Sequence, residues 1–436
     1  MPILCSIGRN PWIILGFLCL GAVSYAAPDD AKQRAKAVRE LGKGGSEAIS
    51  KIEPYISDPD LDVRVEAVKA IVEIGTQRSI DPLIKATRDN DAEIQIRATD
   101  GLVNFYLPGY VRSGLTASLR RIGSSIKSRF TDTNDQVVDP YITVRPEAVQ
   151  ALGRLAKGGA GMDARANAAR AVGILRGREA IPDLLEALRS KDSQVIYESL
   201  IALQKIRERS AGPGVAFLLR DLNERVQIAA IETTGLLMNR GAMNDLRDIL
   251  DRTHNGKVKR AALTALAQMP DAQIHGLYLS YLDNKEEGLR EAAAEGLARS
   301  KNPADRVALE NAFPMEKKNE PRLALAFAVV SLGKLGMGEL DPLRYLVNNL
   351  NNAGYRGVAR AYLIELARDA SVRQALYPAL HETSSTKDEK VNLAQVFAQS
   401  GDRDSVPVLE ELSKDGSNDV SQEALRSLKN LRARLP

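Results

Sequence analysis

Apolar positions recur along the chain with the spacing of amphipathic helices that are arranged in pairs. In the clearest copy, Ile181, Leu184, Leu185 and Leu188 follow the i, i+3, i+4, i+7 spacing of one helix face. Small and apolar residues at 164–175 predict a preceding helix, with a turn between the two. Such a hairpin leaves an apolar stripe that only neighbouring hairpins can cover, so the pattern predicts a stack of hairpins.

The hairpin pattern repeats at intervals of about 31 residues, with Arg64 as the anchor of a typical unit. Alanine follows the anchor by three residues in nine of thirteen units, and glycine follows it by eight in four. Small side chains at one helical position predict a close approach of neighbouring helices. Because no strand pattern of similar strength occurs, we expect an all-α solenoid of about 12 hairpins. The anchors are Arg34, Arg64, Arg97, Arg145, Arg165, Ile196, Gln227, Lys259, Arg290, Arg322, Arg356, Asn392 and Ser421, and the glycines are Gly42, Gly153, Gly173 and Gly235.

The repeat spacing breaks between Arg97 and Arg165. This interval of 68 residues corresponds to about two repeats, so we expect an enlarged or displaced segment at 106–144. Within it, apolar residues at helical spacing and five basic residues without an acid predict a basic amphipathic helix. Two interpretations stay open: an ordinary second helix with a solvated charged face, or a docking helix for an acidic partner or an anionic membrane surface. The basic residues are Arg112, Arg120, Arg121, Lys127 and Arg129.

Two stretches resemble a known repeat family. Val63-Arg64 followed by Ala67, and Ala171-Val172-Gly173 followed by Ala180-Ile181-Pro182, are similar to HEAT repeats of the short variety named after phycobilisome lyases. The resemblance covers residues 30–435. It implies a superhelix of hairpins whose second helices line the concave side, where partners of such proteins usually bind.

The amino terminus is typical of a secretory signal peptide. Residues 1–27 contain Arg9, an apolar run at 12–23 and small residues before Pro28. The apolar run is too short to span a bilayer in the usual way. We therefore expect cleavage, a solenoid at 28–436 and a secreted or periplasmic protein, with an uncleaved anchor as the alternative.

Charge and cysteine content exclude several classes of function. The whole chain has a formal net charge of +4, and removal of residues 1–27 takes away one arginine and no acid. A nearly neutral protein lacks the basic excess typical of nucleic-acid binding, so we expect no nucleic-acid partner. Both cysteines, Cys5 and Cys19, lie in the removable segment, and the mature chain would have neither a disulfide nor a thiolate nucleophile.

Histidine gives little support for catalysis. The chain has only His254, His275 and His381, which lie far apart in the repeat series. The iron-binding deoxyhypusine hydroxylases built from HEAT repeats use several His-Glu pairs, and this chain has one, at 381–382. We therefore expect no catalytic site, no metal and no cofactor.

Three arginines follow the apolar stripe of their second helices at matching positions, namely Arg88, Arg189 and Arg220. They either lay their stems over neighbouring apolar surface or bind an elongated partner of complementary charge. We expect a monomeric, non-catalytic scaffold of the cell envelope that binds a protein through its concave face or the basic helix. The alternatives are a lyase-like enzyme and a protein that binds envelope polymers or contacts the membrane surface.

Overall fold

The computed structural model describes residues 30–110, 136–381 and 385–435. In this part of the chain the regular structure is entirely helical, and the helices form eleven successive hairpins followed by one last helix. The all-α solenoid is thus confirmed. The predicted signal peptide at 1–27 lies outside the described residues. Among the helices that are described, none is long and apolar enough to cross a membrane.

The first helices of the hairpins form one layer of the stack. They are α1 (Ala31–Gly42), α3 (Leu61–Ile74), α5 (Ala92–Tyr106), α8 (Met162–Ile174), α10 (Ser193–Ile206), α11 (Glu224–Leu236), α13 (Gly256–Ala267), α15 (Glu287–Ser300), α17 (Asn319–Ser331), α19 (Arg356–Leu366) and α22 (Lys387–Ser400), and the last helix is α24 (Asn418–Arg434).

The second helices form the other layer, and short 3-10 turns precede most of them. They are α2 (Ile49–Ile52) with η1 (Gly45–Ala48) and η2 (Glu53–Ser57), α4 (Ile80–Ala86) after η3 (Gln77–Ser79), α7 (Pro146–Gly158), α9 (Ile181–Ala187) after η6 (Arg178–Ala180), η7 (Arg209–Leu218), α12 (Met243–Arg252) after η8 (Arg240–Ala242), α14 (His275–Tyr281) after η9 (Ala272–Ile274), α16 (Arg306–Met315) after η10 (Pro303–Asp305), α18 (Pro342–Asn348) with η11 (Asn349–Asn351), α20 (Ala370–Leu376) with α21 (Pro378–His381), and α23 (Ser405–Leu412).

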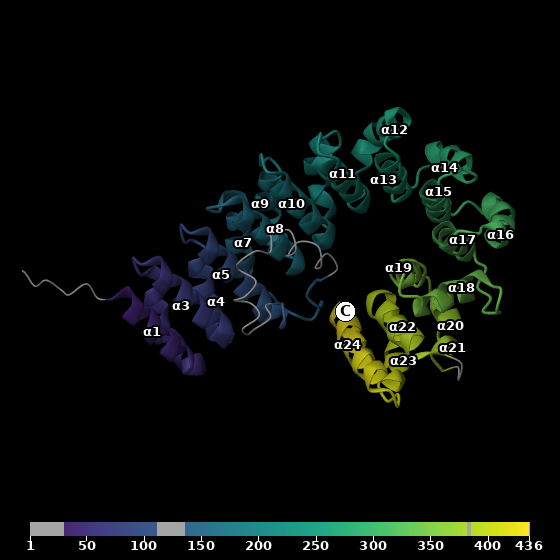
Figure 1. The fold of residues 1–436 in the computed structure, drawn as a ribbon. Helices are drawn as coiled ribbons and strands as arrows, with labels where there is room; N and C mark the ends of the chain where they lie inside the picture. Colours follow the sequence, from purple (N-terminus) through teal and green to yellow (C-terminus); the bar gives the residue numbers. More distant parts are fainter. Residues whose placement is uncertain (1–29, 111–135, 382–384, 436) are drawn as a thin grey trace, which may run out of the picture.

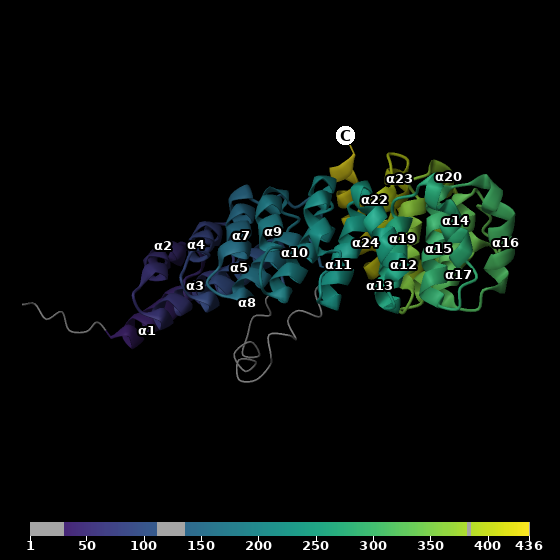
Figure 2. The ribbon, with the colours of Figure 1, turned by 90° about the horizontal axis from the view of Figure 1, so that it is seen from above.

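The stack changes shape along its length. From α11 onward the hairpins curve into an arch that brings α24 back toward the middle of the chain, whereas the first hairpins extend away from it (Figures 1 and 2). The first helices α13, α15, α17, α19 and α22 lie inside the arch, and α12, α14 and α16 lie outside it (Figure 1). The expectation that second helices line the concave side is therefore wrong for the arch.

Small residues bring the first helices together, as the sequence predicts. A Cβ atom added to Gly173 would lie 2.7 Å from the Cα of Ala202 in the next first helix, and one added to Gly235 would lie 2.7 Å from the Cα of Ala265. Eight of the nine alanines that follow an anchor are buried, and Ala37 at the start of the stack is exposed. Close backbone packing thus holds the first layer together.

Between Arg97 and Arg165, the described residues contain one hairpin, formed by α5 and α7, so Arg145 is not the anchor of a first helix. Arg145 precedes α7, and α7 packs between the second helices α4 and α9. Residues 107–145 therefore form an enlarged connection between α5 and α7. Gly153 occurs at the position typical of a first helix because the second helix α7 also packs closely against its neighbour. A Cβ atom added to Gly153 would lie only 2.8 Å from the Cβ of Ala180.

Several anchor arginines join successive hairpins. Arg64 Nε donates to Asp89 at 2.9 Å, and its Nη1 donates to the carbonyl oxygen of Asp58 at 2.9 Å. Arg290 makes the same two kinds of bond, to Glu316 at 2.7 Å and to the carbonyl oxygen of Asn284 at 2.8 Å. These arginines thus connect the end of one second helix to the end of the next.

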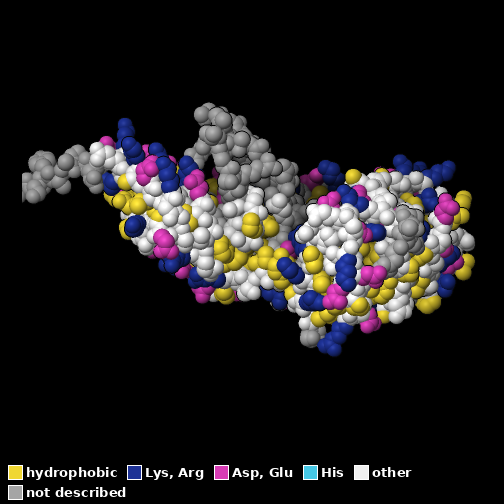
Figure 3. Space-filling view, turned by 90° about the horizontal axis from the view of Figure 1, so that it is seen from below, with side chains coloured by type: hydrophobic (Ala, Val, Ile, Leu, Met, Phe, Trp, Pro, Cys, Tyr) yellow, Lys and Arg dark blue, Asp and Glu magenta, His cyan; other side chains and the backbone are white. Residues whose placement is uncertain are grey.

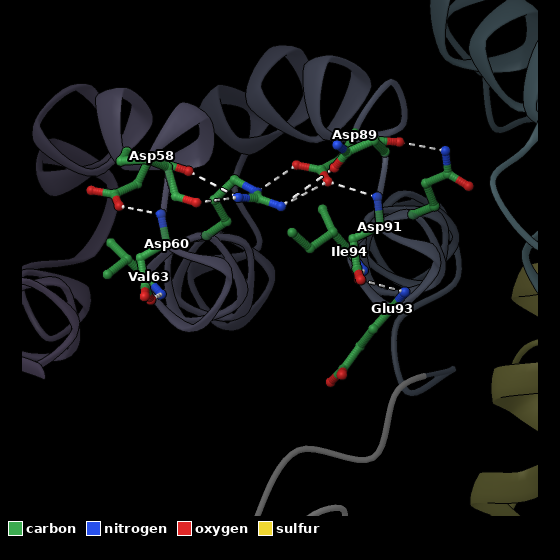
Figure 4. Close-up of polar contacts among 11 residues, drawn as sticks. Asp58, Asp60, Val63, Asp89, Asp91, Glu93 and Ile94 are labelled. Carbon is green, nitrogen blue, oxygen red and sulfur yellow. Dashed lines mark hydrogen bonds and ion pairs between the residues drawn. The ribbon is translucent and has the colours of Figure 1, made fainter. Parts of the chain in front are cut away.

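The acids at these junctions also start the first helices. Figure 4 shows Asp58 and Asp89 in successive turns, each followed by an aspartate that caps a helix. Asp60 accepts from the backbone N–H of Val63 at 3.2 Å, and Asp91 accepts from that of Ile94 at 3.1 Å. The repeated arginine and aspartate positions are therefore explained by hairpin stacking and helix capping.

Candidate functional site

The enlarged connection touches the carboxyl-terminal helix and closes the arch. Arg426 of α24 donates from Nε and Nη2 to the two carboxylate oxygens of Asp139, both at 2.9 Å. Asn430 donates to the same carboxylate at 3.2 Å. This contact joins residues that are 287 and 291 positions apart, and the nearby Asp139 carboxylate raises the pKa of Arg426.

The segment that carries Asp139 is anchored at both ends to the solenoid. The backbone N–H of Val138 donates to the carbonyl oxygen of Ile174, which ends α8, at 2.9 Å. At the other end, the N–H of Arg145 donates to the hydroxyl of Tyr106 at 3.1 Å, and the Arg145 guanidinium lies 2.8 Å from Asp81. We refer to residues 136–145 as the closing segment.

A groove lies between the closing segment and the last hairpins. Its volume is about 830 Å³, and Tyr141 and Leu425 expose 43% and 42% of their surface beside it. A smaller cavity of about 340 Å³ is also bordered by Arg426 and lies against Tyr110 and Val137. The groove is lined by Tyr141, Lys387, Asp388, Val391, Asp419, Gln422, Glu423, Leu425, Arg426 and Lys429.

Most charges in the groove have a partner of opposite sign within the protein. Lys387 lies 2.7 Å from Asp419, and Asp388 forms an ion pair with Arg356. Lys429 places its ammonium 6.0 Å from the centre of the Tyr141 ring. The groove therefore combines exposed apolar surface with charges of both signs, which is typical of protein-binding surfaces.

Within the arch, first helices that are two hairpins apart contact each other. Arg299 of α15 donates to Glu365 of α19 at 2.9 Å and to Glu295 at 3.0 Å. The buried hydroxyl of Tyr362 donates to Glu295 at 2.7 Å, and its ring stacks on Phe327 of the intervening α17 at 4.7 Å. Although burial opposes the charge of Arg299, the two glutamates raise its pKa. We call Glu295, Arg299, Phe327, Tyr362 and Glu365 the bend cluster.

One acid beside the bend cluster has an unusual proton affinity. Glu291, one turn before Glu295 on α15, is half-buried. Burial, together with the charge of Glu295, raises the pKa of Glu291 to about 7. This carboxyl therefore changes charge in the neutral pH range.

The structure places the arginines predicted from the second helices at separate points, just after α4, α9 and η7. Arg88 is exposed just after α4, and Arg189 lies 5.6 Å from the ring centre of the exposed Phe217. Arg220 lies 2.8 Å from Asp248 of the following second helix. Arg189 thus lies over neighbouring surface and Arg220 is neutralised, while partner binding by these three arginines stays a prediction.

The remaining predicted site residues are the five basic residues of the enlarged segment. Arg112, Arg120, Arg121, Lys127 and Arg129 lie outside the described residues. On the face drawn in Figure 3, basic and acidic side chains alternate without a large area of one sign. This mixture agrees with the small net charge of the chain.

The described histidines show no metal site. His275 Nε2 lies 2.7 Å from Asp305, which belongs to the next hairpin. Across residues 30–110, 136–381 and 385–435, no three His, Cys, Asp or Glu side chains form a group that could hold a metal ion. The pair of His275 and Asp305 connects two hairpins.

Sequence reasoning missed the groove and the bend cluster. Asp139 and Tyr141 lie in a segment without a helical pattern, and their partners are nearly 300 residues away. Glu295 and Arg299 have the i, i+4 spacing of an ordinary surface ion pair. The only available signal was the enlarged connection itself, which repeat proteins often use for binding.

Comparison with solved structures finds similar helical repeat proteins. The complex of CpcE and CpcF of phycocyanin lyase from Nostoc sp. PCC7120 is 18% identical, with 58% of this chain and 94% of that chain covered and a TM-score of 0.35. Human deoxyhypusine hydroxylase is 16% identical, with 66% and 96% covered and a TM-score of 0.28. Importin beta is 13% identical, with 93% and 60% covered and a TM-score of 0.39. The comparison with curated proteins found no match.

Comparison with protein families identifies the repeats themselves. The family described as HEAT repeats matches residues 22–103 and 243–330. The family described as PBS lyase HEAT-like repeat matches residues 164–190, the clearest hairpin in the sequence. The chain is therefore an all-α solenoid with stretches that match models of HEAT repeats and of the PBS lyase HEAT-like repeat.

Proposed function

We propose that the protein is a non-catalytic scaffold that binds a protein partner in the groove between the closing segment and helices α22 and α24. The observation that carries this proposal is the exposure of Tyr141 and Leu425 in one groove, beside Arg426 and Lys429. Tyrosine and arginine are enriched among the residues that dominate binding energy, and apolar centres with polar rims are typical of interfaces.

The repeat architecture supports the same proposal. HEAT repeats commonly serve as protein-binding surfaces, and the first helices α11, α13 and α15 carry polar side chains that are exposed or only partly buried, namely Glu232, Arg260 and Glu291. Stacked hairpins bury their small residues in close backbone contacts and leave one face free, so a partner can contact several hairpins at once.

We also propose that the scaffold works outside the cytoplasm, because residues 1–27 are typical of a signal peptide. Amino-terminal sequencing of the protein isolated from its own cells tests this. A mature chain that begins at Ala27 or Pro28 is the expected result. An intact residue 1–27 segment in the membrane fraction would instead support an uncleaved anchor.

The binding proposal is tested by crosslinking capture from cell envelope with the full chain and a Leu425→Glu variant. We expect the wild type to capture a defined protein. After purification of that protein, calorimetry should show at least tenfold weaker binding to the variant, because a charge replaces apolar contact at the groove.

The matched control is Leu340→Glu, since Leu340 is 87% exposed and lies outside the groove. Equal loss in both variants, or no loss in either, would reject the groove as the binding site. A further variant changes Arg120, Arg121, Lys127 and Arg129 to glutamate. If only this variant loses the partner, the basic segment predicted from the sequence is the docking site.

A further inference from the structure

The contact between Asp139 and α24 has the features of a ligand held in a carboxylate-binding site. The planar guanidinium of Arg426 donates two parallel hydrogen bonds, an arrangement that fits any carboxylate. Asn430 adds a third donor at 3.2 Å. These three bonds come from α24 alone, so the site would remain complete if Asp139 left.

The surroundings of this site extend beyond one carboxylate. The larger groove and the smaller cavity both border Arg426, the residue that holds Asp139. The Oδ1 atom of Asn430 is buried without a hydrogen-bond partner among the described residues. An unpaired buried acceptor costs free energy, so a ligand with a backbone N–H at this point would bind better than the closing segment does.

The neighbouring Lys429 and Tyr141 indicate which side chain the ligand should carry beside its carboxylate. Tyr141 follows Asp139 by two residues and lies beneath the Lys429 ammonium. An acidic residue followed at short distance by an aromatic residue therefore complements α24, with the carboxylate on Arg426 and the ring beside Lys429.

We propose that α24 is a binding site for an acidic, aromatic-containing peptide segment of a protein partner, and that the closing segment occupies this site as an internal competitor. This inference rests on the proposed scaffold function and names the chemistry of its partner. The partner's carboxylate replaces Asp139 on Arg426, and the arch opens where the closing segment contacts α24.

The experiment measures binding of a fluorescent synthetic peptide with the sequence of residues 136–145 to the full-length protein by anisotropy. In the wild type the tethered segment competes at an effective concentration of about millimolar, so the free peptide binds weakly. The Asp139→Asn chain should bind the peptide at least tenfold more tightly, because its own segment competes poorly. A peptide with asparagine at position 139 should bind at least tenfold more weakly than the parent peptide.

A second pair of variants locates the site on α24. In the Asp139→Asn chain, Arg426→Gln should abolish peptide binding, whereas Arg432→Gln should leave it unchanged, because Arg432 pairs with Glu410 outside the groove. Circular dichroism verifies that each variant keeps its helices. Equal peptide binding by the wild type and the Asp139→Asn chain, or binding that survives Arg426→Gln, would overturn the inference.

This assay is independent of any cellular protein. Peptide binding without capture from cell envelope would reject the scaffold proposal alone. Capture that depends on Leu425, without peptide binding to the Asp139→Asn chain, would reject the internal competitor and leave the scaffold proposal in place.

Discussion

The first hairpins and the bend around α17 differ in the contacts that join one hairpin to another. In the first hairpins, Arg64 connects the end of its own hairpin, at Asp89, to the end of the preceding hairpin, at Asp58. At the bend, Arg299 reaches across α17 to Glu365, two hairpins away. Repeated junction residues therefore join successive hairpins, whereas a few long side chains of the first helices join hairpins that are not adjacent, and we infer that the latter hold the curvature.

The largest effect is expected from Arg299→Met in the bend cluster. This change leaves Glu295 and Glu365 without their cation in a partly buried site, which should cost about 3–4 kcal/mol of unfolding free energy. The arch should also open, so small-angle X-ray scattering should show a larger maximum dimension. Urea unfolding followed by circular dichroism measures the stability.

The control for the bend is Arg306→Met. Arg306 pairs with Glu310 on the surface of α16 and should contribute less than about 0.5 kcal/mol. Equal stability and equal dimensions of the two variants would show that the bend cluster does not set the curvature.

The next largest loss of stability is expected from overpacking the contacts between first helices. Gly173→Val places a side chain where a Cβ atom already lies 2.7 Å from the Cα of Ala202. The backbones must separate, and we expect a loss of about 2–3 kcal/mol in urea unfolding. Gly158→Val is the control, because its added Cβ meets no atom within 4 Å. If both variants lose the same stability, helix propensity rather than close packing explains the effect.

Removal of one junction arginine should have a moderate effect. Arg64→Ala breaks a half-buried pair with Asp89 and a bond to a carbonyl oxygen, at a cost of about 1–2 kcal/mol in thermal or urea unfolding. Arg78→Ala breaks a pair of similar length, 2.7 Å to Glu47, between exposed side chains. Its cost should stay below about 0.5 kcal/mol, and a similar loss in both variants would argue against a special role of the junctions.

The smallest expected effect is a pH-dependent change in stability caused by Glu291. Its pKa is raised from 4.5 to about 7 by burial and by Glu295, so the folded state favours its protonated form. The stability from this group is therefore full below about pH 4.5 and is lost as the pH rises through about 7. The full shift would correspond to about 3 kcal/mol. Because Glu291 keeps part of its surface in contact with water, we expect Glu291→Gln to be more stable than the wild type by about 1 kcal/mol at pH 8 and similar to it at pH 4.

Melting temperatures at both pH values measure this difference. The exposed Glu179→Gln variant should show no such pH dependence. A difference between wild type and Glu291→Gln that is constant from pH 4 to pH 8 would contradict the shifted proton affinity.

The local fold could be predicted from the sequence because each hairpin is a local structure. Residues 164–175 and 181–188 were expected as helices, and the structure has them at Met162–Ile174 and Ile181–Ala187. Gly173 and Gly235 were expected at close helix contacts, and both lie there. These properties depend on neighbours within one repeat length.

The candidate site could not be predicted because its contacts are not local. Asp139 meets Arg426 only after the solenoid has curved through the bend at α17, and no periodicity encodes that meeting. Arg145 was misassigned for a similar reason, since Ala148 and Gly153 repeat the first-helix pattern on a second helix. Sequence periodicity identified the packing positions but not the layer to which α7 belongs.

The closing contact also limits how the chain can change its length. Solenoids usually lengthen or shorten by whole repeats, and each hairpin displaces the next by about 8–10 Å. A hairpin gained or lost between α8 and α24 would move Arg426 much farther from Asp139 than their 2.9 Å bonds permit. We therefore expect the number of hairpins before α8 to vary among related proteins and the number after it to stay fixed. The contact between Asp139 and Arg426 would thus determine how many repeats this part of the solenoid can contain.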